Sequence, residues 1–258
     1  MTAELSIVVP VYNEGPAIGG CLDRLFTDVA SPCEVLVVYD TPEDTTVPPL
    51  LDYAGRDARL VPTHNTYGRG PANAIRFGMD HASSPVIVVT MSDGSDQTDQ
   101  IDEMARRVRE GAAVVAASRY MRGGRQVGGP MFKSLLSKGA GLSLGVLGRV
   151  GTRDATNSFK AYSTEFIREV GIDSRSGFEI GLELTAKARR LRRPVAEVPT
   201  IWLDRTLGES NFQLSAWIPR YLRWYRFAFG KPLTTQQVHR AATQIAQQNN
   251  KPSRKRKP

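Results

Sequence analysis

Acidic and aromatic side chains follow directly after two apolar segments near the start of the chain. Tyr12 and Glu14 come after the run at residues 5–11, and Asp40 ends the run at residues 33–39. One helix-length segment separates the runs, so they form a βαβ unit whose parallel strands end at one edge of a sheet. Open α/β sheets bind ligands beyond that edge. Carboxylates there can accept hydrogen bonds from ribose hydroxyls and base amines, and a ring can stack on the base. The alternative is an ordinary capped turn.

A third apolar run, at residues 86–91, ends in an acidic turn. Ser92, Asp93 and Asp96 follow it within five positions. Mg²⁺ and Mn²⁺ favour carboxylate oxygens and keep waters and substrate phosphates in their coordination shell. Asp93 and Asp96 are therefore the candidate metal ligands, and the alternative is a solvated acidic turn.

The spacing of the apolar runs predicts a mostly parallel sheet wrapped by helices. Such alternation is typical of an α/β, Rossmann-like fold. Strands are expected at residues 4–9, 34–39, 58–61, 86–91 and 113–117, and helices at 16–28, 46–54, 71–82 and 98–109. After a flexible basic loop at 122–130, we expect helices at 131–148 and 177–191 and strands at 158–162 and 195–203.

Composition limits the classes of partner. The chain has 258 residues and a net charge of +8, which indicates an anionic partner such as phosphate, nucleic acid or a membrane surface. Two cysteines give no disulfide framework and fit a reducing compartment. We expect no signal peptide and no membrane-spanning helix, because the chain lacks a basic n-region and a run of 18 apolar residues.

Residues 213–229 combine an apolar aromatic side with an arginine side. At about 100° per residue, Arg220, Arg223 and Arg226 lie opposite an apolar set, with Phe227 as the exception. That set is Leu214, Trp217, Ile218, Tyr221, Leu222, Trp224, Tyr225, Ala228 and Phe229. Such a helix either lies in a membrane interface or packs on the sheet. Five basic residues in the last eight favour an anionic membrane. We therefore expect an amphipathic interfacial helix at 213–230 and a basic, disordered tail at 231–258.

Six segments of the chain together resemble the inverting glycosyltransferases of family 2. The similarity is to the branch that contains dolichol-phosphate mannosyltransferase and other polyprenyl-phosphate glycosyltransferases. The matching segments are residues 10–14, the strand ending in Asp40, and residues 91–93, 117–120, 157–162 and 198–210. They occur in the family's order, so the set is far more specific than any one of them.

The resemblance implies a GT-A type domain over residues 1–212 and a role for each matching residue. Asp93, Arg119 and Arg205 are the catalytic candidates, Mg²⁺ or Mn²⁺ is the implied cofactor, and Arg119 and Lys133 would hold the phosphate of a lipid acceptor. The residues implied for the donor nucleotide are Pro10, Tyr12, Glu14, Asp40, Ser92, Asp93, Arg205 and Ser210.

Two positions depart from the family's pattern. The pair of carboxylates usual after the second strand is reduced to Asp40, which is followed by Thr41. Met91 replaces the first aspartate of the metal motif. A thioether is a poor ligand for Mg²⁺, so Asp96 is the candidate for the second metal carboxylate.

The implied function is metal-assisted transfer of a sugar, with inversion, from a GDP- or UDP-linked donor to a polyprenyl phosphate. The expected location is peripheral, on the cytoplasmic face of an anionic membrane. A glycan or small-molecule acceptor is the first alternative, and a non-enzymatic nucleic-acid module is the second. We expect no nucleic-acid partner. A module that binds nucleic acid would have stacking aromatic residues interleaved with its basic residues, whereas residues 213–229 keep their aromatic and arginine residues on separate sides. A membrane-protein partner or a homo-oligomer is left open.

Overall fold

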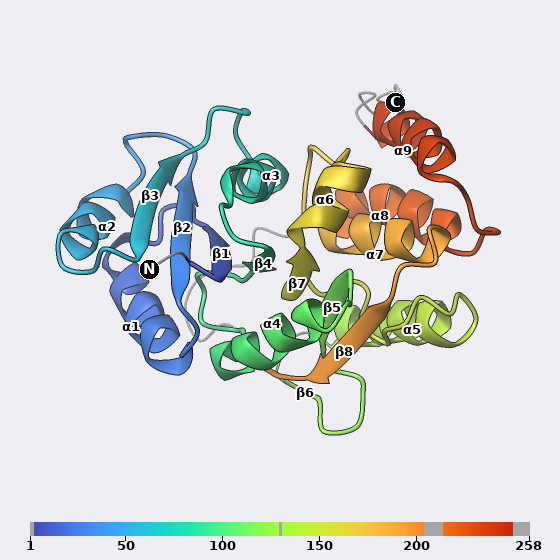
Figure 1. Ribbon diagram of the computed structural model, residues 1–258, viewed down its shortest axis with the longest axis horizontal. Coiled ribbons are helices and arrows are strands. Elements are labelled where there is room, and N and C mark those ends of the chain that lie inside the picture. Colours follow the sequence, from blue (N-terminus) through green and yellow to red (C-terminus); the bar gives the residue numbers. More distant parts are fainter. Residues whose placement is uncertain (1–2, 129–130, 204–213, 250–258) are drawn as a thin grey trace.

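A mixed seven-stranded sheet forms the centre of the computed structural model, which describes residues 3–128, 131–203 and 214–249 (Figure 1). In sheet order the strands are β3 (Leu60–His64), β2 (Cys33–Tyr39), β1 (Leu5–Pro10), β4 (Val86–Val89), β7 (Lys160–Ser163), β5 (Val114–Ser118) and β8 (Val195–Pro199). Neighbouring strands are parallel except β7, which pairs antiparallel with β4 and β5. The expectation of a mostly parallel α/β sheet is therefore confirmed.

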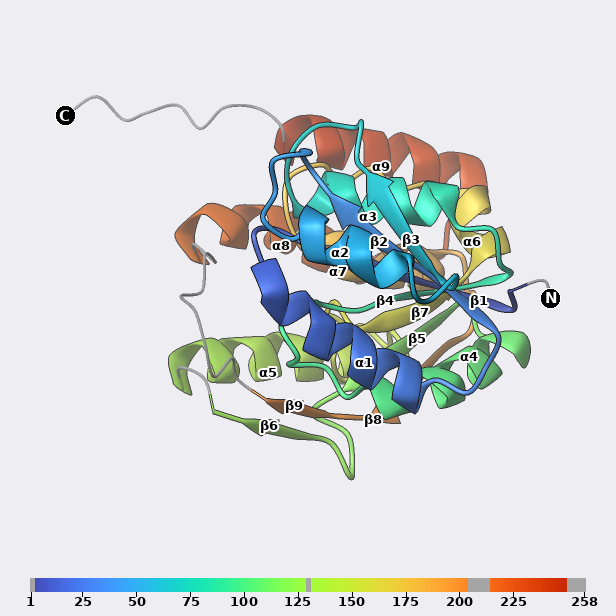
Figure 2. The same ribbon diagram turned by 90° about the vertical axis from the view of Figure 1, so that its left-hand side faces the viewer.

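Helices cover both faces of this sheet, which explains why its strands are continuous apolar runs. One face packs on α1 (Ile18–Asp28), α2 (Val47–Ala54) and α4 (Ile101–Arg109). The other packs on α3 (Pro71–His81), α6 (Thr164–Val170) and α7 (Ile180–Arg190). Figure 2 shows α3 above the sheet and α1 and α4 below it. The approach of α3 depends on Gly78, because a Cβ there would lie 2.5 Å from Cγ1 of Val8.

Three further helices gather around a third apolar cluster. They are α5 (Met131–Val146), α8 (Leu214–Ala228) and α9 (Thr235–Asn249). In α8, Trp224, Phe227 and Ala228 are buried against α7 and α9. Trp224 is therefore a core residue, and its Nε1 donates to Ser174 Oγ at 3.1 Å. The prediction that Trp224 lies on a membrane-facing side is wrong, and so is the reading of Phe227 as the exposed exception.

Two other segments differ from the sequence-based expectation. Residues 235–249 form α9, although a disordered tail was expected from residue 231, because Val238, Ala242 and Ala246 form an apolar stripe that is buried. The expected flexible loop contains β6 (Arg125–Val127), which pairs with β9 (Ile201–Leu203). Among the described helices, none combines the length and the hydropathy that a membrane span requires.

Candidate active site

A pocket of about 220 Å³ lies at the carboxyl ends of β1 and β2. Its lining is mostly polar or acidic: Tyr12, Asn13, Asp40, Thr41, Glu43, Asp44 and Arg69. Tyr12 is 65% exposed at this pocket, so its ring is available to a ligand. The structure thus brings together Tyr12 and Asp40, as the two strand ends predict.

The turn after β1 is held by an acidic side chain that the sequence reasoning missed. The backbone N–H of Asn13 donates to both carboxylate oxygens of Asp44, at 3.1 and 3.0 Å. Asp44 also accepts from the backbone N–H of Thr46 at 2.8 Å, an Asx-type contact. Asn13 itself has φ of 55°, which asparagine tolerates better than most residues. The signal in the sequence was Asp44 two positions before Thr46, which precedes a helix, a spacing typical of such a turn.

Asp40 has structural partners as well as a place in the pocket. Its Oδ1 accepts from Nδ2 of Asn65 at 2.7 Å, and its Oδ2 accepts from the backbone N–H of Gly70 at 2.7 Å. Asn65 is buried and Gly70 has φ of 114°, so the segment leading into α3 is fixed in one conformation. A carboxylate oxygen can accept more than one hydrogen bond, so Asp40 can hold this segment and still accept from a ligand.

The acidic turn after β4 lies beside the end of β1. Ser92 Oγ donates to Glu14 Oε1 at 3.0 Å, and the backbone oxygen of Pro10 lies 3.5 Å from Ser92 Oγ. Asp93 Oδ1 accepts from the backbone N–H and the hydroxyl of Ser95, at 3.0 and 2.6 Å. These contacts fix the Asp93 carboxylate on a short turn. The structure therefore brings Pro10, Glu14, Ser92 and Asp93 to one place, as predicted.

Asp96 lies underneath this turn rather than on it. Its side chain is buried, and Oδ2 accepts from Thr90 Oγ1 and from the backbone N–H of Met91, both at 3.0 Å. Burial raises the pKa of Asp96 to about 6, with the nearby Asp93 carboxylate acting in the same direction. This placement favours a structural role for Asp96 over the metal-ligand role expected from the sequence.

One carboxylate on a fixed turn still fits a divalent cation of the Mg²⁺ type. Such ions are commonly held by one or two carboxylates, with waters and substrate phosphates completing the shell. Among the described residues no cluster of three or more acidic, histidine or cysteine side chains could hold a metal without such help. Asp93 is the residue that suits this arrangement.

Arg119 follows directly after β5 and is locked by Asp154. Its Nε and Nη2 donate to Oδ2 and Oδ1 of Asp154 at 2.7 and 2.9 Å, and its backbone N–H donates to Oδ2 at 3.0 Å. Burial alone would lower the pKa of Arg119, but the paired Asp154 raises it overall, so the guanidinium stays charged. Of the three guanidinium nitrogens of Arg119, Nη1 alone has no acceptor among the described residues. The sequence reasoning found Arg119 and missed Asp154.

Two more ionisable side chains, Lys160 and Glu179, are fully buried. Nζ of Lys160 donates to the backbone oxygens of Asp154, Ala155 and Asn157. Burial, with the neighbouring Arg119 charge, lowers the pKa of Lys160 to about 7. Glu179 precedes α7 with no exposed surface, and neither of its carboxylate oxygens has a hydrogen-bond partner within residues 3–128, 131–203 and 214–249. Burial raises the pKa of Glu179.

Three of the predicted site residues lie outside what the structure describes. Arg205 and Ser210 belong to residues 204–213, and the side chain of Lys133 in α5 is not described.

With this geometry in place, comparison with known proteins identifies the class. Residues 6–171 match the family described as "Glycosyl transferase family 2". The chain belongs to that family.

Two relatives show which branch of the family the chain is similar to. It is 29% identical over 210 residues to an undecaprenyl-phosphate mannosyltransferase of Micrococcus luteus, covering 79% of this chain and 85% of the relative. It is 26% identical over 238 residues to a dolichol-phosphate mannosyltransferase of Pyrococcus furiosus, covering 86% of this chain and 64% of that longer relative. The predicted resemblance is therefore confirmed.

Solved structures share the fold at lower identity. Glucosyl-3-phosphoglycerate synthase from Mycobacterium tuberculosis, in complex with Mn²⁺, UDP and glucosyl-3-phosphoglycerate, has a TM-score of 0.64 and 16% identity, over 90% of this chain and 82% of its own. A mannosyltransferase from Pyrobaculum calidifontis in complex with GDP-Man and Mn²⁺ has a TM-score of 0.58 and 17% identity, over 96% of this chain and 74% of its own. The expected GT-A fold is confirmed.

Proposed function

We propose that this chain transfers a sugar from a nucleoside diphosphate donor to a polyprenyl phosphate, with inversion at the anomeric carbon. The observation that carries this proposal is the arrangement at one sheet edge. A nucleoside-sized acidic pocket and the Asp93 turn follow β1, β2 and β4, and a charged arginine follows β5 on the same edge. The relatives that act on polyprenyl phosphates support the choice of acceptor.

The chemistry needs positioning and charge more than proton transfer. An oxygen of the acceptor phosphate forms a bond to the anomeric carbon, and the bond from that carbon to the donor diphosphate breaks with the electron pair leaving on the diphosphate. The acceptor oxygen is already anionic, so a general base is not required. Asp93 would hold a divalent cation, and such an ion would supply positive charge that stabilises the leaving diphosphate. Tyr12 and Asp40 would orient the nucleoside, and Nη1 of Arg119 would hold the acceptor phosphate.

The decisive assay is transfer of labelled sugar by the full chain. UDP-glucose and GDP-mannose would be offered with Mn²⁺ or Mg²⁺ and undecaprenyl or dolichyl phosphate in detergent, and label in the extracted lipid would be counted. We expect label in the lipid, and Asp93→Asn should reduce it at least about 100-fold. The matched control is Asp99→Asn, since Asp99 is an exposed carboxylate a few positions away. A parallel reaction would offer 3-phosphoglycerate as the acceptor. Label in that compound and none in either polyprenyl phosphate would refute the proposal and favour the alternative class of small-molecule acceptors.

We also propose that the chain docks on the cytoplasmic face of an anionic membrane. Part of α8 and the residue just after it remain apolar and exposed: Ile218 is 46% exposed and Leu222 is 40% exposed, and Phe229, which follows the helix, is 40% exposed. These residues recur at helical spacing along one edge of the wide apolar side, whose other edge carries the buried Trp224. The exposed Arg226 and the five basic residues at 251–258 supply positive charge.

Vesicle co-sedimentation at low and high salt separates these contributions. Leu222→Ser with Phe229→Ser should weaken the binding that survives high salt, because it depends on apolar burial. Removing residues 251–258 should weaken mainly the low-salt binding, which is screened over about 10 Å at 0.1 M salt. Leu51→Ser, at a 55% exposed site on α2, is the control. If the double α8 variant binds vesicles as the parent does at both salt levels, α8 does not contact the membrane.

A further inference from the structure

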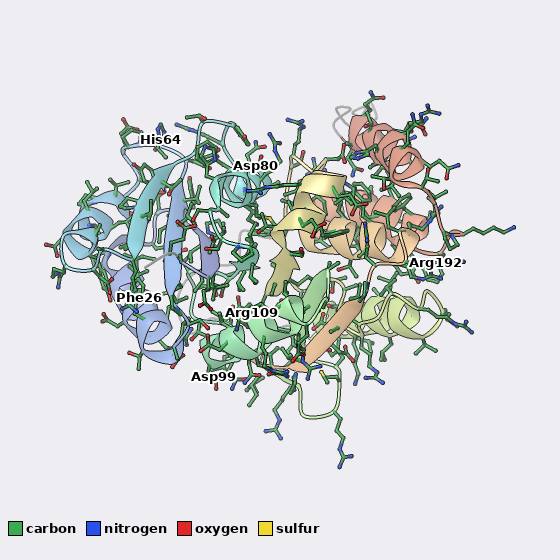
Figure 3. All side chains as sticks on the ribbon, viewed as in Figure 1. Phe26, His64, Asp80, Asp99, Arg109 and Arg192 are labelled. Atoms are coloured by element: carbon green, nitrogen blue, oxygen red, sulfur yellow. The ribbon has the colours of Figure 1, made fainter. Side chains whose placement is uncertain are left out.

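A second pocket, of about 300 Å³, is lined by four arginines and lies far from the candidate active site. Its lining is Arg149, Val150, Gly151, Arg189, Arg192, Arg193 and Val195. Val195 begins β8, which runs parallel to β5, and Arg119 follows the far end of β5. Five residues of strand therefore separate the pocket from that edge by about 13 Å. Figure 3 shows Arg192 at the end of the molecule that carries α5 and α7, away from His64 at the end of β3.

The backbone builds this pocket at some conformational cost. Arg149 and Arg192 have φ of 51° and 56°, the left-handed region that side chains with a Cβ rarely adopt. Between them Gly151 has φ of 86°, and a Cβ there would lie 2.7 Å from Cβ of Val195. Two loops, one after α5 and one after α7, thus turn their arginines towards one cavity.

The charges in this pocket are only partly compensated. Arg193 pairs with Glu169 at 2.7 Å, and Nε of Arg189 donates to the backbone oxygen of Gly148 at 2.9 Å. Within the part of the chain that the structure describes, the guanidinium groups of Arg149 and Arg192 have no acceptor. The carboxyl ends of α7 and α5 both attract cations, which accounts for an arginine near each helix end but not for the convergence of both sets on one cavity. Four like charges around one cavity repel one another, and an anion would relieve that repulsion.

We propose that this arginine pocket binds the phosphate group of an anionic ligand, with Arg149 and Arg192 as the main donors. Guanidinium groups present paired N–H donors that match phosphate oxygens. Val146 and Leu147, at the end of α5, are 64% and 73% exposed just before Arg149. An apolar surface beside a phosphate site suits a phospholipid headgroup, and a free phosphate compound would use the same donors. The pocket is separate from the transfer site, so the inference does not rest on the proposed activity.

The test compares Arg149→Gln/Arg192→Gln with a matched control. Arg168→Gln/Arg240→Gln removes the same charge from exposed arginines of α6 and α9. The first arm measures the melting temperature of the full chain in inorganic phosphate against sodium chloride of equal ionic strength. Phosphate at about twenty times its Kd should raise the melting temperature of the parent and the control by about 4 °C. The pocket variant should lose most of that rise.

The second arm identifies the source of the phosphate by using phosphatidylglycerol vesicles, with phosphatidylcholine vesicles as the neutral comparison. For a lipid headgroup, the pocket variant should bind phosphatidylglycerol vesicles about 30-fold more weakly than the parent, given about 1 kcal/mol for each arginine, and more weakly than the control. An unchanged vesicle affinity together with a lost phosphate response assigns the pocket to a free phosphate compound. A phosphate response that is absent from the parent, or that persists in the pocket variant, overturns the inference.

Discussion

Replacing Asp154 with asparagine should be the most damaging single change around the acceptor side of the site. Asp154 is fully buried and accepts three hydrogen bonds from Arg119, at 2.7, 2.9 and 3.0 Å. Asparagine keeps the size but removes the charge, which leaves the 11% exposed Arg119 side chain without a counter-ion. Breaking a buried ion pair in this way costs about 3–5 kcal/mol. That is a large fraction of the stability of an ordinary domain, which is about 5–15 kcal/mol.

Glu197→Gln provides the matched control. Glu197 pairs with Arg153 at 2.8 Å, but the Arg153 side chain is 50% exposed, so this change should cost at most about 1 kcal/mol. Urea unfolding followed by tryptophan fluorescence measures both variants. If Asp154→Asn loses no more free energy of unfolding than Glu197→Gln, the argument from the buried pair is wrong.

The double variant Arg119→Met/Asp154→Leu separates stability from activity. Replacing a buried pair by apolar residues of similar size is often neutral or stabilising, so we expect unfolding free energy close to that of the parent. Transfer should remain lost, because no guanidinium is left to hold the acceptor phosphate. A double variant that is stable and active would show that Arg119 does not contact the acceptor.

Three further changes test other parts of the molecule. The pKa of Asp96 in the folded state is raised from 3.8 to about 6, so between these pH values the native state binds more protons than the unfolded state and the free energy of unfolding falls as pH rises. In urea titrations at pH 4 to 7, Asp96→Asn should lose this part of the pH dependence. A pH dependence equal to that of the parent would count against the raised pKa. Glu179→Gln should raise the melting temperature, because it removes the charge of a buried carboxylate that has no hydrogen-bond partner among the described residues. Glu103→Gln should lower the melting temperature, because arginines hold the pKa of Glu103 at about 2. Equal shifts of the two variants would contradict this assignment. Gly78→Ala should destabilise the fold by about 1–3 kcal/mol through overpacking against Val8. Gly19→Ala, with open space around the new methyl group, should stabilise the fold by up to about 1 kcal/mol. Unfolding curves of the two variants that coincide would refute the close approach of α3.

The sheet and its functional edge could be predicted from the sequence because both depend on local patterns. Apolar runs of strand length predict that Tyr12, Asp40 and Asp93 follow the carboxyl ends of three parallel strands. In the structure all three residues lie at that edge of the sheet. Asp154 could not be predicted, since it is 35 positions from Arg119 and nothing local marks the pair. The partial burial of Asp40 could not be predicted for the same reason, because its partners Asn65 and Gly70 lie in the loop between β3 and α3, 25 and 30 positions further along the chain.

The interpretation of α8 shows how a periodic pattern can mislead. A helical wheel finds one wide apolar side, but it does not indicate what that side contacts. In the structure Trp224 and Ala228 pack in the core, while Ile218 and Leu222 on the same broad side remain exposed. The basic composition near the end likewise concealed the short stripe that buries α9.

The antiparallel strand β7 has a consequence for how such a protein can diversify. Because β7 lies between β4 and β5, the chain leaves the sheet after Ser118 and returns at Lys160, beside the strand it left. Everything between, including Arg119, β6, α5 and Asp154, is a single excursion whose two ends are already adjacent. Doubling the length of a flexible excursion costs only about 0.6 kcal/mol in closure entropy. This part of the proposed acceptor side can therefore lengthen or change chemistry by insertion while the proposed donor pocket, built on β1 and β2, keeps its register.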